Sequence, residues 1–300
     1  MKMRRCQKFN EPSWIGFLFL GLFLFHHTLE AAETQIFSGP VSMAMGGGGR
    51  TGNEATEMIF LNPATVAMAQ GFETGASYRD GYWAKGQHES SYHVSMIEND
   101  ENNFAIGGIG FVQKRRTAPN LAWDDRVLLA ALAKKVTSEW SLGGSFYQLK
   151  QKTGDGVGYT QWNGSIGTLY TLGTGFGVAY VYSNPGKIDR DIPVPMKQLP
   201  QQSLAINMLF RQLMRVTVDV TRLEKENPDK KGIIQIGNEM RASEYGVFRL
   251  GFEIDDIAKR NSITGGFGFI GPRLRANYAI VKPLKETSGA MHSVDLRLPF

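Results

Sequence analysis

The chain has almost no cysteine and, beyond its N-terminal segment, no long apolar run, and each lack excludes a class of protein. Its only cysteine, Cys6, lies before the first apolar run, so a chain exported by cleavage after that run has no thiol. Disulfides, thiolate metal sites and cysteine nucleophiles are therefore excluded. The mean hydropathy is -0.23, and nothing after Phe25 approaches the ~20 apolar residues of a membrane-spanning helix, which excludes a helical membrane protein.

The chain also has little excess charge and few histidines. Its 33 lysines and arginines against 28 aspartates and glutamates give a formal net charge of +5, which does not indicate a nucleic-acid partner. His88, His93 and His292 each lie near a serine, but none stands in a recognisable nucleophile context or has the spacing of metal ligands. We therefore expect no catalytic residue, no metal site and no cofactor.

The N-terminal segment has the form of a secretory signal peptide. Basic residues between positions 2 and 8 precede an apolar run at residues 14–25, which is too short to span a membrane as a helix. The small residues Ala31 and Ala32 follow, as expected near a cleavage site. We interpret residues 1–31 as a signal peptide and expect the rest of the chain to be exported.

Residues 32–71 are rich in glycine and do not alternate between polar and apolar. Three glycines between positions 47 and 52 match the dinucleotide-binding spacing G-x-G-x-x-G, but no apolar strand precedes them, and Asn53 stands where a phosphate-binding loop needs lysine. Consecutive glycines let a backbone turn tightly and pack close to a wall, and Asn62-Pro63 signals a turn or the start of a helix. The segment therefore suits a compact plug.

From Phe72 onward the sequence divides into alternating segments of about ten residues, the length of tilted membrane strands. Turn residues bound them, and their number is even, as a bacterial single-chain barrel requires. They predict an all-β protein, a transmembrane up-and-down antiparallel barrel of about 14 strands. The expected strands are residues 72–82, 87–98, 103–114, 125–136, 140–152, 158–171, 175–184, 201–211, 214–223, 232–242, 245–254, 261–270, 273–281 and 290–300.

The links between these segments alternate in length, which favours a barrel over a soluble β-sandwich. Counting back from the C-terminus, residues 282–289, 255–260, 224–231 and 184–200 are long links, and short links of two or three residues lie between them. Residues 115–124 are also expected to form a long loop. Barrels of this kind have short periplasmic turns and longer outer loops, so we expect the basic long links to face outward.

Within the strands, charged residues share one face and apolar residues the other. An arginine on the lipid side at mid-depth costs about 2–4 kcal/mol, so the charged face is expected to line the lumen. These charges either set the selectivity of a pore or pair with one another, and we favour pairing. The predicted lumen-lining residues are Arg215, Asp219, Glu239, Arg249, Glu253, Arg273, Arg275, Asp295 and Arg297.

The last ten residues alternate strictly and end on an aromatic. A final strand that finishes on phenylalanine resembles the signal that assembles bacterial outer-membrane barrels. The residues of this predicted assembly signal are Val294, Leu296, Leu298 and Phe300.

Two parts of the chain resemble a known family. The run Met43–Gly47 and the triplet Asn62-Pro63-Ala64 look like the N-terminal signature of the FadL-type long-chain fatty-acid transporters and their PorV-type relatives. Residues 216–221, 233–241, 265–269, 273–281 and 292–300 are similar to the PorV-type branch. The resemblance implies a plug at residues 32–71, folded inside a barrel at residues 72–300, in the outer membrane of a diderm bacterium.

The resemblance implies uptake or passage of a small hydrophobic molecule through the plugged barrel. The gate would be formed by Gly46, Gly47, Gly48, Gly49, Asn62, Pro63 and Ala64. A static plug is the alternative. PorV-type members imply instead a docking protein for a secreted or surface protein, without transport. The apolar stretch 192–196 would then contact the partner or, alternatively, fold over the barrel mouth. Outer-membrane lipid and the assembly machinery are expected partners in either case.

Overall fold

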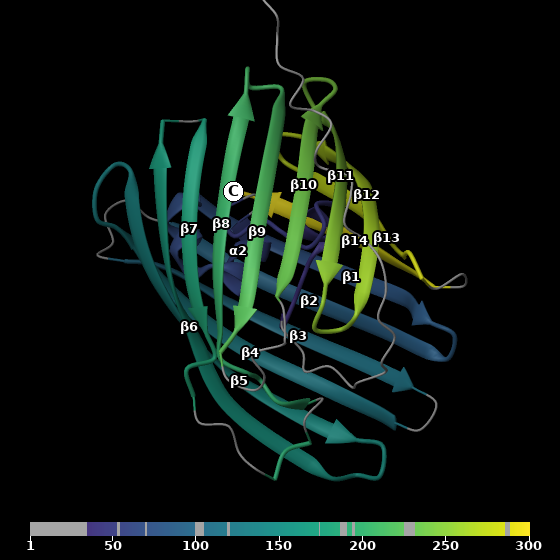
Figure 1. Ribbon diagram of the computed structural model, residues 1–300. Coiled ribbons are helices and arrows are strands. Elements are labelled where there is room, and N and C mark those ends of the chain that lie inside the picture. The colour runs from purple at the N-terminus through teal and green to yellow at the C-terminus, as the bar shows by residue number, and fades with distance from the viewer. Residues whose placement is uncertain are drawn as a thin grey trace, which may run out of the picture.

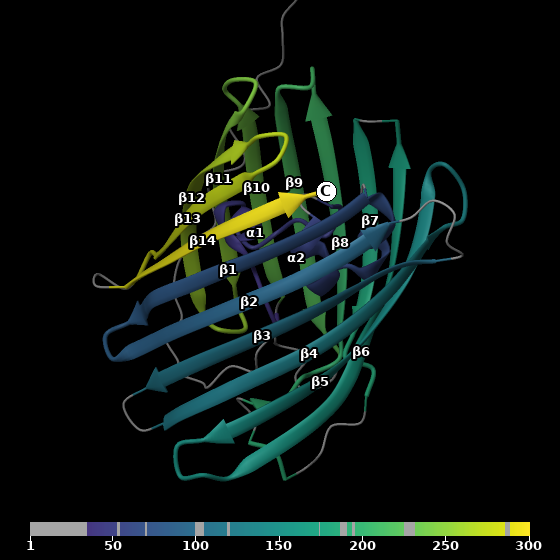
Figure 2. The same cartoon turned by 180° about the vertical axis from the view of Figure 1, so that it is seen from behind.

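The structure of the protein is a computed structural model. It describes residues 35–52, 55–69, 71–99, 105–118, 121–173, 175–186, 191–193, 196–224, 232–285 and 289–300. The expected signal peptide lies outside these residues. The described residues form one closed antiparallel barrel that surrounds three short helices near the N-terminus (Figures 1 and 2). We call residues 35–52 and 55–69 the plug, because they lie within the barrel.

The helices belong to the plug and the strands to the wall. The helices are α1 (Pro40–Ala44), α2 (Ala55–Leu61) and the 3-10 helix η2 (Pro63–Met68). The strands are β1 (Gly71–Ala84), β2 (Gln87–Asn99), β3 (Ile106–Ala118), β4 (Leu121–Lys135), β5 (Trp140–Thr153), β6 (Gly158–Leu172), β7 (Phe176–Ser183), β8 (Gln201–Phe210), β9 (Met214–Leu223), β10 (Ile233–Arg241), β11 (Gly246–Asp255), β12 (Arg260–Ile270), β13 (Arg275–Pro283) and β14 (Ala290–Pro299).

Each strand pairs with the next along the chain, and β1 closes the barrel on β14. The closing register runs from Glu73 opposite Pro299 to Tyr82 opposite Ala290. Every predicted segment became a strand, so the predicted 14-strand up-and-down barrel is confirmed for the described residues. The match arises because the alternation and the turn residues are local signals that barrel closure does not override.

The predicted long loop at residues 115–124 is wrong. The ladder continues through most of it, with Arg115 opposite Asp124 and Arg116 opposite Trp123. The Arg115 Nε atom lies 3.1 Å from Asp124 Oδ2. Opposite charges facing each other across two strands stabilise the pairing, so a stretch that looks like a polar loop extends the hairpin instead.

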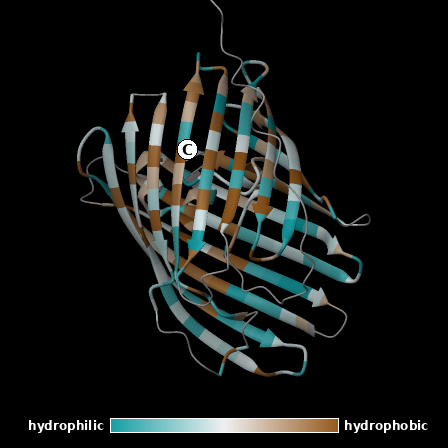
Figure 3. Ribbon diagram, in the orientation of Figure 1, coloured by the Kyte–Doolittle hydropathy of each residue, from teal (hydrophilic) through white to brown (hydrophobic). Residues whose placement is uncertain are grey.

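Burial alternates along the strands and separates an outer from an inner face. Hydrophobic and hydrophilic residues form alternating bands along many of the strands (Figure 3). Neighbouring residues differ sharply, since Leu128 is 61% exposed and Leu129 only 2%. The same holds on β11, where Leu250 is 66% exposed and Arg249 is 1% exposed. Among the described residues, no helix is both long and apolar enough to cross a membrane.

The C-terminal strand presents the predicted assembly residues on the outer face. Val294, Leu296 and Leu298 are 47%, 57% and 42% exposed. The Phe300 backbone N–H donates to the Phe72 carbonyl oxygen at 2.9 Å, and the two rings lie 5.8 Å apart between centroids. The end of the chain is therefore joined to the start of β1.

Candidate functional site

The plug contacts nearly the whole inner circumference of the barrel. Helix α1 packs against β11 to β14, α2 against β1 to β3, and η2 against β4 to β6. The glycine-rich turn after α1 reaches β9 to β11. The interface between plug and wall is the candidate functional site, because anything that passes through the lumen must pass along it.

Glycines of the wall make this contact close. A Cβ atom placed on Gly251 of β11 would lie 2.2 Å from the backbone nitrogen of Gly46. One on Gly167 of β6 would lie 2.0 Å from Asn62 Oδ1. Both distances are too short for real atoms, so only glycine admits the plug here. The same close approach is found at Gly110, Gly143, Gly237 and Gly266.

The glycine-rich turn is held by one buried carboxylate. Asp219 on β9, which is fully buried, accepts hydrogen bonds from the backbone N–H groups of Gly49 and Arg50 at 3.0 and 3.1 Å. It also pairs with the Arg50 guanidinium at 3.1 Å, and that group donates to Gln235 at 3.0 Å. The backbone of this turn needs glycine at several positions, because Gly46, Gly47 and Gly49 have positive φ. Gly48 does not have a positive φ, so the conformation of the turn does not require glycine at this position.

The triplet Asn62-Pro63-Ala64 joins the turn to the opposite wall. Asn62 caps η2 by accepting from the Ala64 N–H at 3.0 Å, while its amide nitrogen donates to the Arg50 carbonyl at 2.8 Å. Ser141 on β5 donates to the Ala64 carbonyl at 3.0 Å. An amide both accepts and donates, which explains why asparagine rather than aspartate suits this position.

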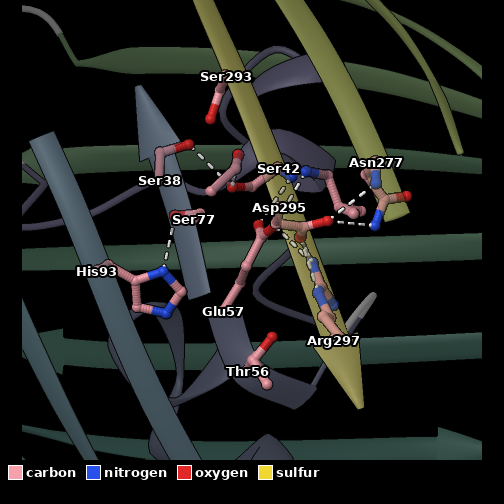
Figure 4. A network of polar contacts seen from close by, with 12 residues as sticks. Ser38, Ser42, Thr56, Glu57, Ser77, His93, Asn277, Ser293, Asp295 and Arg297 are labelled. Carbon is pink, nitrogen blue, oxygen red and sulfur yellow. Dashed lines mark hydrogen bonds and ion pairs between the residues drawn. The ribbon is translucent and has the colours of Figure 1, made fainter. Parts of the chain in front are cut away.

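A second buried anchor fixes the start of α1 (Figure 4). The Glu57 carboxylate accepts from the backbone N–H groups of Val41 and Ser42, both at 2.9 Å, and pairs with Arg297 on β14 at 2.8 Å. Burial raises the pKa of Glu57 above its ordinary value. Arg297 opposes this shift, but Asp295 already lies 2.6 Å from the same guanidinium, so two carboxylates share one positive charge.

From Arg297 a chain of polar contacts follows the inner wall from β14 to β9. Asp295 accepts from the Asn277 side chain at 2.8 Å, and Asn277 accepts from Arg249 at 2.8 Å. Arg249 pairs with Glu239 at 2.8 Å, and Glu239 lies 3.7 Å from Arg215. The contact between Asn277 and Arg249 crosses β12 where Gly268 stands, and a Cβ there would lie 2.3 Å from Asn277 Oδ1.

The other predicted lumen charges lie in different surroundings. Arg275 is 3.7 Å from Glu73, and Glu253 is 3.9 Å from Arg260 and accepts from Gln235 at 3.0 Å. Arg273 is a wrong prediction as a lumen residue. It is exposed in the turn before β13, where the Gly271 N–H donates to the Leu274 carbonyl, so the turn is longer than the two residues expected.

The inner wall of β3 to β5 is apolar where the plug packs on it, unlike the polar lumen that the sequence predicts. Towards the β3–β4 turn the same wall carries the buried side chains of Lys114, Asp125 and Gln151. The correction arises because β4 is apolar on both faces, so alternation did not reveal its inner side. Phe37, Ile59 and Phe60 of the plug pack against this wall. The wall side chains in this cluster are Ile106, Val112, Val127, Leu129, Ala131, Ala133, Tyr147 and Leu149, together with Ile97 of β2.

A buried histidine lies at the edge of the apolar wall. His93 on β2 contacts the hydroxyls of Ser77 at 2.7 Å and Ser95 at 3.1 Å, and its ring lies 4.1 Å from that of Phe37. Ser95 in turn donates to the Thr56 carbonyl in the plug at 3.0 Å. The contacts of His93 thus place it in the packing of the plug. No metal-binding group of His, Cys, Asp or Glu occurs in the described part of the chain.

The link between β7 and β8 lies at the end of the barrel that carries the long links, and part of it is buried. Ile192 and Met196, in the link between β7 and β8, are 4% and 1% exposed. Gln161 on β6 donates to the Met196 carbonyl at 2.8 Å. These two apolar residues therefore fold against the barrel. Val194 and Pro195, part of the same predicted apolar stretch, lie outside the described residues.

Sequence reasoning missed the two charges of the plug, Arg50 and Glu57. Within the described residues 35–52 and 55–69 they are the only charged side chains, and each meets a predicted lumen carboxylate or arginine. The signal that could have found them is that each is a single charge in a segment expected to lie inside the lumen. A buried charge needs a partner, and the lumen was expected to carry charges.

Replacing Arg297 with methionine is expected to destabilise the protein by about 3–5 kcal/mol, because Glu57 and Asp295 would remain buried without their cation. Glu57→Gln should cost far less, because the amide oxygen can still accept a backbone hydrogen bond and Arg297 keeps Asp295 as its partner. Urea unfolding in micelles, followed by heat-modifiable gel mobility, gives both values. Arg222→Met, at an exposed position of β9, is the control. Equal effects of the two buried substitutions would contradict the assigned anchor.

Comparisons with known proteins bear on the fold. No protein-family model matches the chain, and no curated protein matches its sequence. Among solved structures, the toluene transporter TbuX of Ralstonia pickettii is 16% identical, with a TM-score of 0.63 over 87% of this chain and 97% of that one. The monoaromatic hydrocarbon channel CymD is 15% identical, with a TM-score of 0.69 over 87% and 97%.

A Pseudomonas aeruginosa FadL homologue is 10% identical, with a TM-score of 0.63 over 89% of this chain and 99% of that one. The likeness therefore extends over almost the whole of each solved structure. This protein has the fold of the FadL-type barrels, a closed wall of fourteen strands in its described residues.

Proposed function

We propose that this protein is an outer-membrane barrel through which a small hydrophobic molecule passes, with the plug controlling the path. The observation that carries the proposal is the apolar inner wall of β3 to β5, packed on Phe37, Ile59 and Phe60 of the plug. The three solved structures compared above are a toluene transporter, a monoaromatic hydrocarbon channel and a FadL homologue. Their similarity in fold supports a hydrophobic solute for this protein.

The plug is bound to the two sides of the barrel wall by different kinds of contact, so moving it away from each side would cost a different amount of free energy. Towards β9 to β14 the plug is held by buried ion pairs, and breaking one leaves a buried charge unpaired. Towards β3 to β5 it is held mainly by apolar contacts, which an apolar solute can replace, in addition to the hydrogen bond from Ser141 to the Ala64 carbonyl. A hydrophobic molecule is therefore expected to pass between the plug and the apolar wall while the polar half stays anchored.

A pocket next to this path shows where plug and wall fit less closely. Ile36, Arg50, Phe60 and Leu61 of the plug line one side of it. Side chains of β6 to β8 and the residues beside them line the other: Ser165, Ser183, Asn184 and Gln201. Its lining is mostly polar, with Gln35 and Arg50 on the plug side as well, so this pocket suits a polar group rather than an apolar solute.

Leu129→Gln is expected to slow uptake of an apolar fluorescent probe, N-phenyl-1-naphthylamine, by about tenfold in cells that carry the barrel in their outer membrane. Glutamine is similar in size to leucine but places an unsatisfied polar group on the path, which costs about 1–3 kcal/mol. Leu128→Gln is the matched control, because the adjacent side chain is 61% exposed on the outer face.

Folded amounts of both variants are compared by heat-modifiable mobility before uptake is measured. If the two variants behave alike, the path does not follow β4. A wild-type barrel that gives no uptake above empty cells would contradict transport and favour the docking alternative. No observation at the site specifically supports docking, since Ile192 and Met196 are buried.

A further inference from the structure

Four cationic side chains lie together on the outer face of the barrel, at the loop end of β3 to β5. They are Arg115, Arg126, Lys150 and Lys152, which we call the cationic cluster. The strand register makes them neighbours, because Asp124 of β4 stands opposite both Arg115 and Lys152, and Arg126 stands opposite Lys150. Asp124 is thus the carboxylate at the centre of the cluster.

Asp124 holds the two guanidinium groups in a fixed arrangement. Its two oxygens accept from Arg115 Nε at 3.1 Å and from Arg126 Nε at 3.2 Å. Gln113 also donates to it at 2.6 Å. Each arginine uses its Nε–H group here, so the edge formed by its two terminal nitrogens is left for another acceptor. The arginine side chains remain 70% and 60% exposed.

The lysines add charge that the described residues do not neutralise. Lys150 and Lys152 form no ion pair within the described part of the chain, and both are exposed. The carboxylate of Asp155 lies nearby in the next turn, where it accepts hydrogen bonds from Thr153 and from the Val157 N–H at 3.3 Å. The cluster therefore keeps an excess of positive charge.

The depth of the cluster decides what it faces. Immediately below it, the outer face is apolar, with Leu128, Phe146 and Trp162 exposed by 61%, 57% and 56%. The rings of Phe146 and Trp162 are stacked at 5.4 Å, with an interplanar angle of 16°. Aromatic side chains and cations mark the edge of the apolar band of a membrane barrel. The cluster therefore lies at the depth of lipid headgroups.

We propose that the cationic cluster binds the phosphate groups of a lipid in the leaflet at the loop end of the barrel. The terminal nitrogens of Arg115 and Arg126 form two forks that match phosphate oxygens, and the lysines supply further charge. The acyl chains of the same lipid lie on Leu128, Phe146 and Trp162. The site is independent of the lumen and of the proposed transport.

The test uses the purified full chain in uncharged detergent micelles, with bis-phosphorylated lipid A as the probe and native mass spectrometry as the readout. Changing all four residues of the cluster to glutamine should raise the dissociation constant at least tenfold. The matched control removes the same charge from the opposite end of the barrel, at Lys134, Lys135, Arg211 and Arg241. Heat-modifiable mobility checks that both variants are folded. An equal loss in the control would overturn the site.

Two further measurements separate a built site from general attraction. Asp124→Asn adds net positive charge but releases both arginines, so it should weaken lipid binding several-fold. Tighter binding by this variant would overturn the proposal. The second measurement replaces lipid A with inorganic pyrophosphate or with the dephosphorylated lipid. Both should bind at least tenfold more weakly than the intact lipid, and equal binding by either would show that a phosphorylated lipid is not the ligand.

Discussion

Deleting residues 36–61 is expected to turn the barrel into an open ion channel in planar bilayers, with a unitary conductance at least tenfold above that of the intact protein. The deleted segment includes α1, the glycine-rich turn and α2, which together contact most strands of the wall. The barrel itself is closed by the pairing of β1 with β14, which does not involve these residues. The wall should therefore remain intact after the deletion, and its lumen should be open.

The ion selectivity of this deletion variant should depend on the charged side chains that line its lumen. Asp219→Asn in the deletion variant removes a carboxylate that has lost its partner Arg50, so the reversal potential in a salt gradient should shift towards anions. The same change at Asp256, in the exposed turn after β11, is the control. Unchanged conductance after the deletion would mean that the plug does not fill the pore.

Gly251→Val should displace the glycine-rich turn from the wall and destabilise the protein by about 1–3 kcal/mol or more, because overpacking cannot be relieved. The added Cβ would lie 2.2 Å from the Gly46 nitrogen and 2.4 Å from the Met45 carbonyl carbon, both backbone atoms. The hydrogen bond from Gly46 to Thr264, at 3.0 Å, should break as well. Intermittent conductance and faster proteolysis of the plug in micelles would report the displacement.

Gly265→Val is the control for that substitution. Gly265 lies on β12 beside the same part of the wall, but its nearest neighbour would be 3.6 Å from the new Cβ, at the side chain of Leu250 on the outer face. It should fold normally and stay closed. If Gly251→Val also remained closed and resistant to protease, the close fit of plug and wall would not hold the plug in place.

The strands could be predicted from sequence because their signal is local. Alternation between lipid-facing and inward residues, bounded by turn residues, placed the ends of every strand except β3 and β4 within two residues of those observed. The same reasoning failed where alternation is weak or charge is misleading. On β4 the run from Val127 to Ala133 is apolar on both faces, and at Arg115 charge belongs to a hairpin rather than to a loop.

The plug site was less accessible to sequence reasoning, because its contacts join residues far apart in the chain. Asp219 and Arg297 were expected in the lumen, but nothing local pairs Asp219 with Arg50 or Arg297 with Glu57. The wall glycines were also missed. A glycine such as Gly167 or Gly251 shows its role only when the plug segment opposite is known. These contacts depend on tertiary structure, whereas strand patterns do not.

The ion pair between Glu57 and Arg297 also bears on the order of folding. The two residues are 240 positions apart, and the strand that carries Arg297 is the last in the chain. Contacts of such long sequence separation form late, because much of the chain must first be ordered. Helix α1 therefore cannot gain this anchor before β14 is in place, so the docking of the first helix depends on the placing of the last strand.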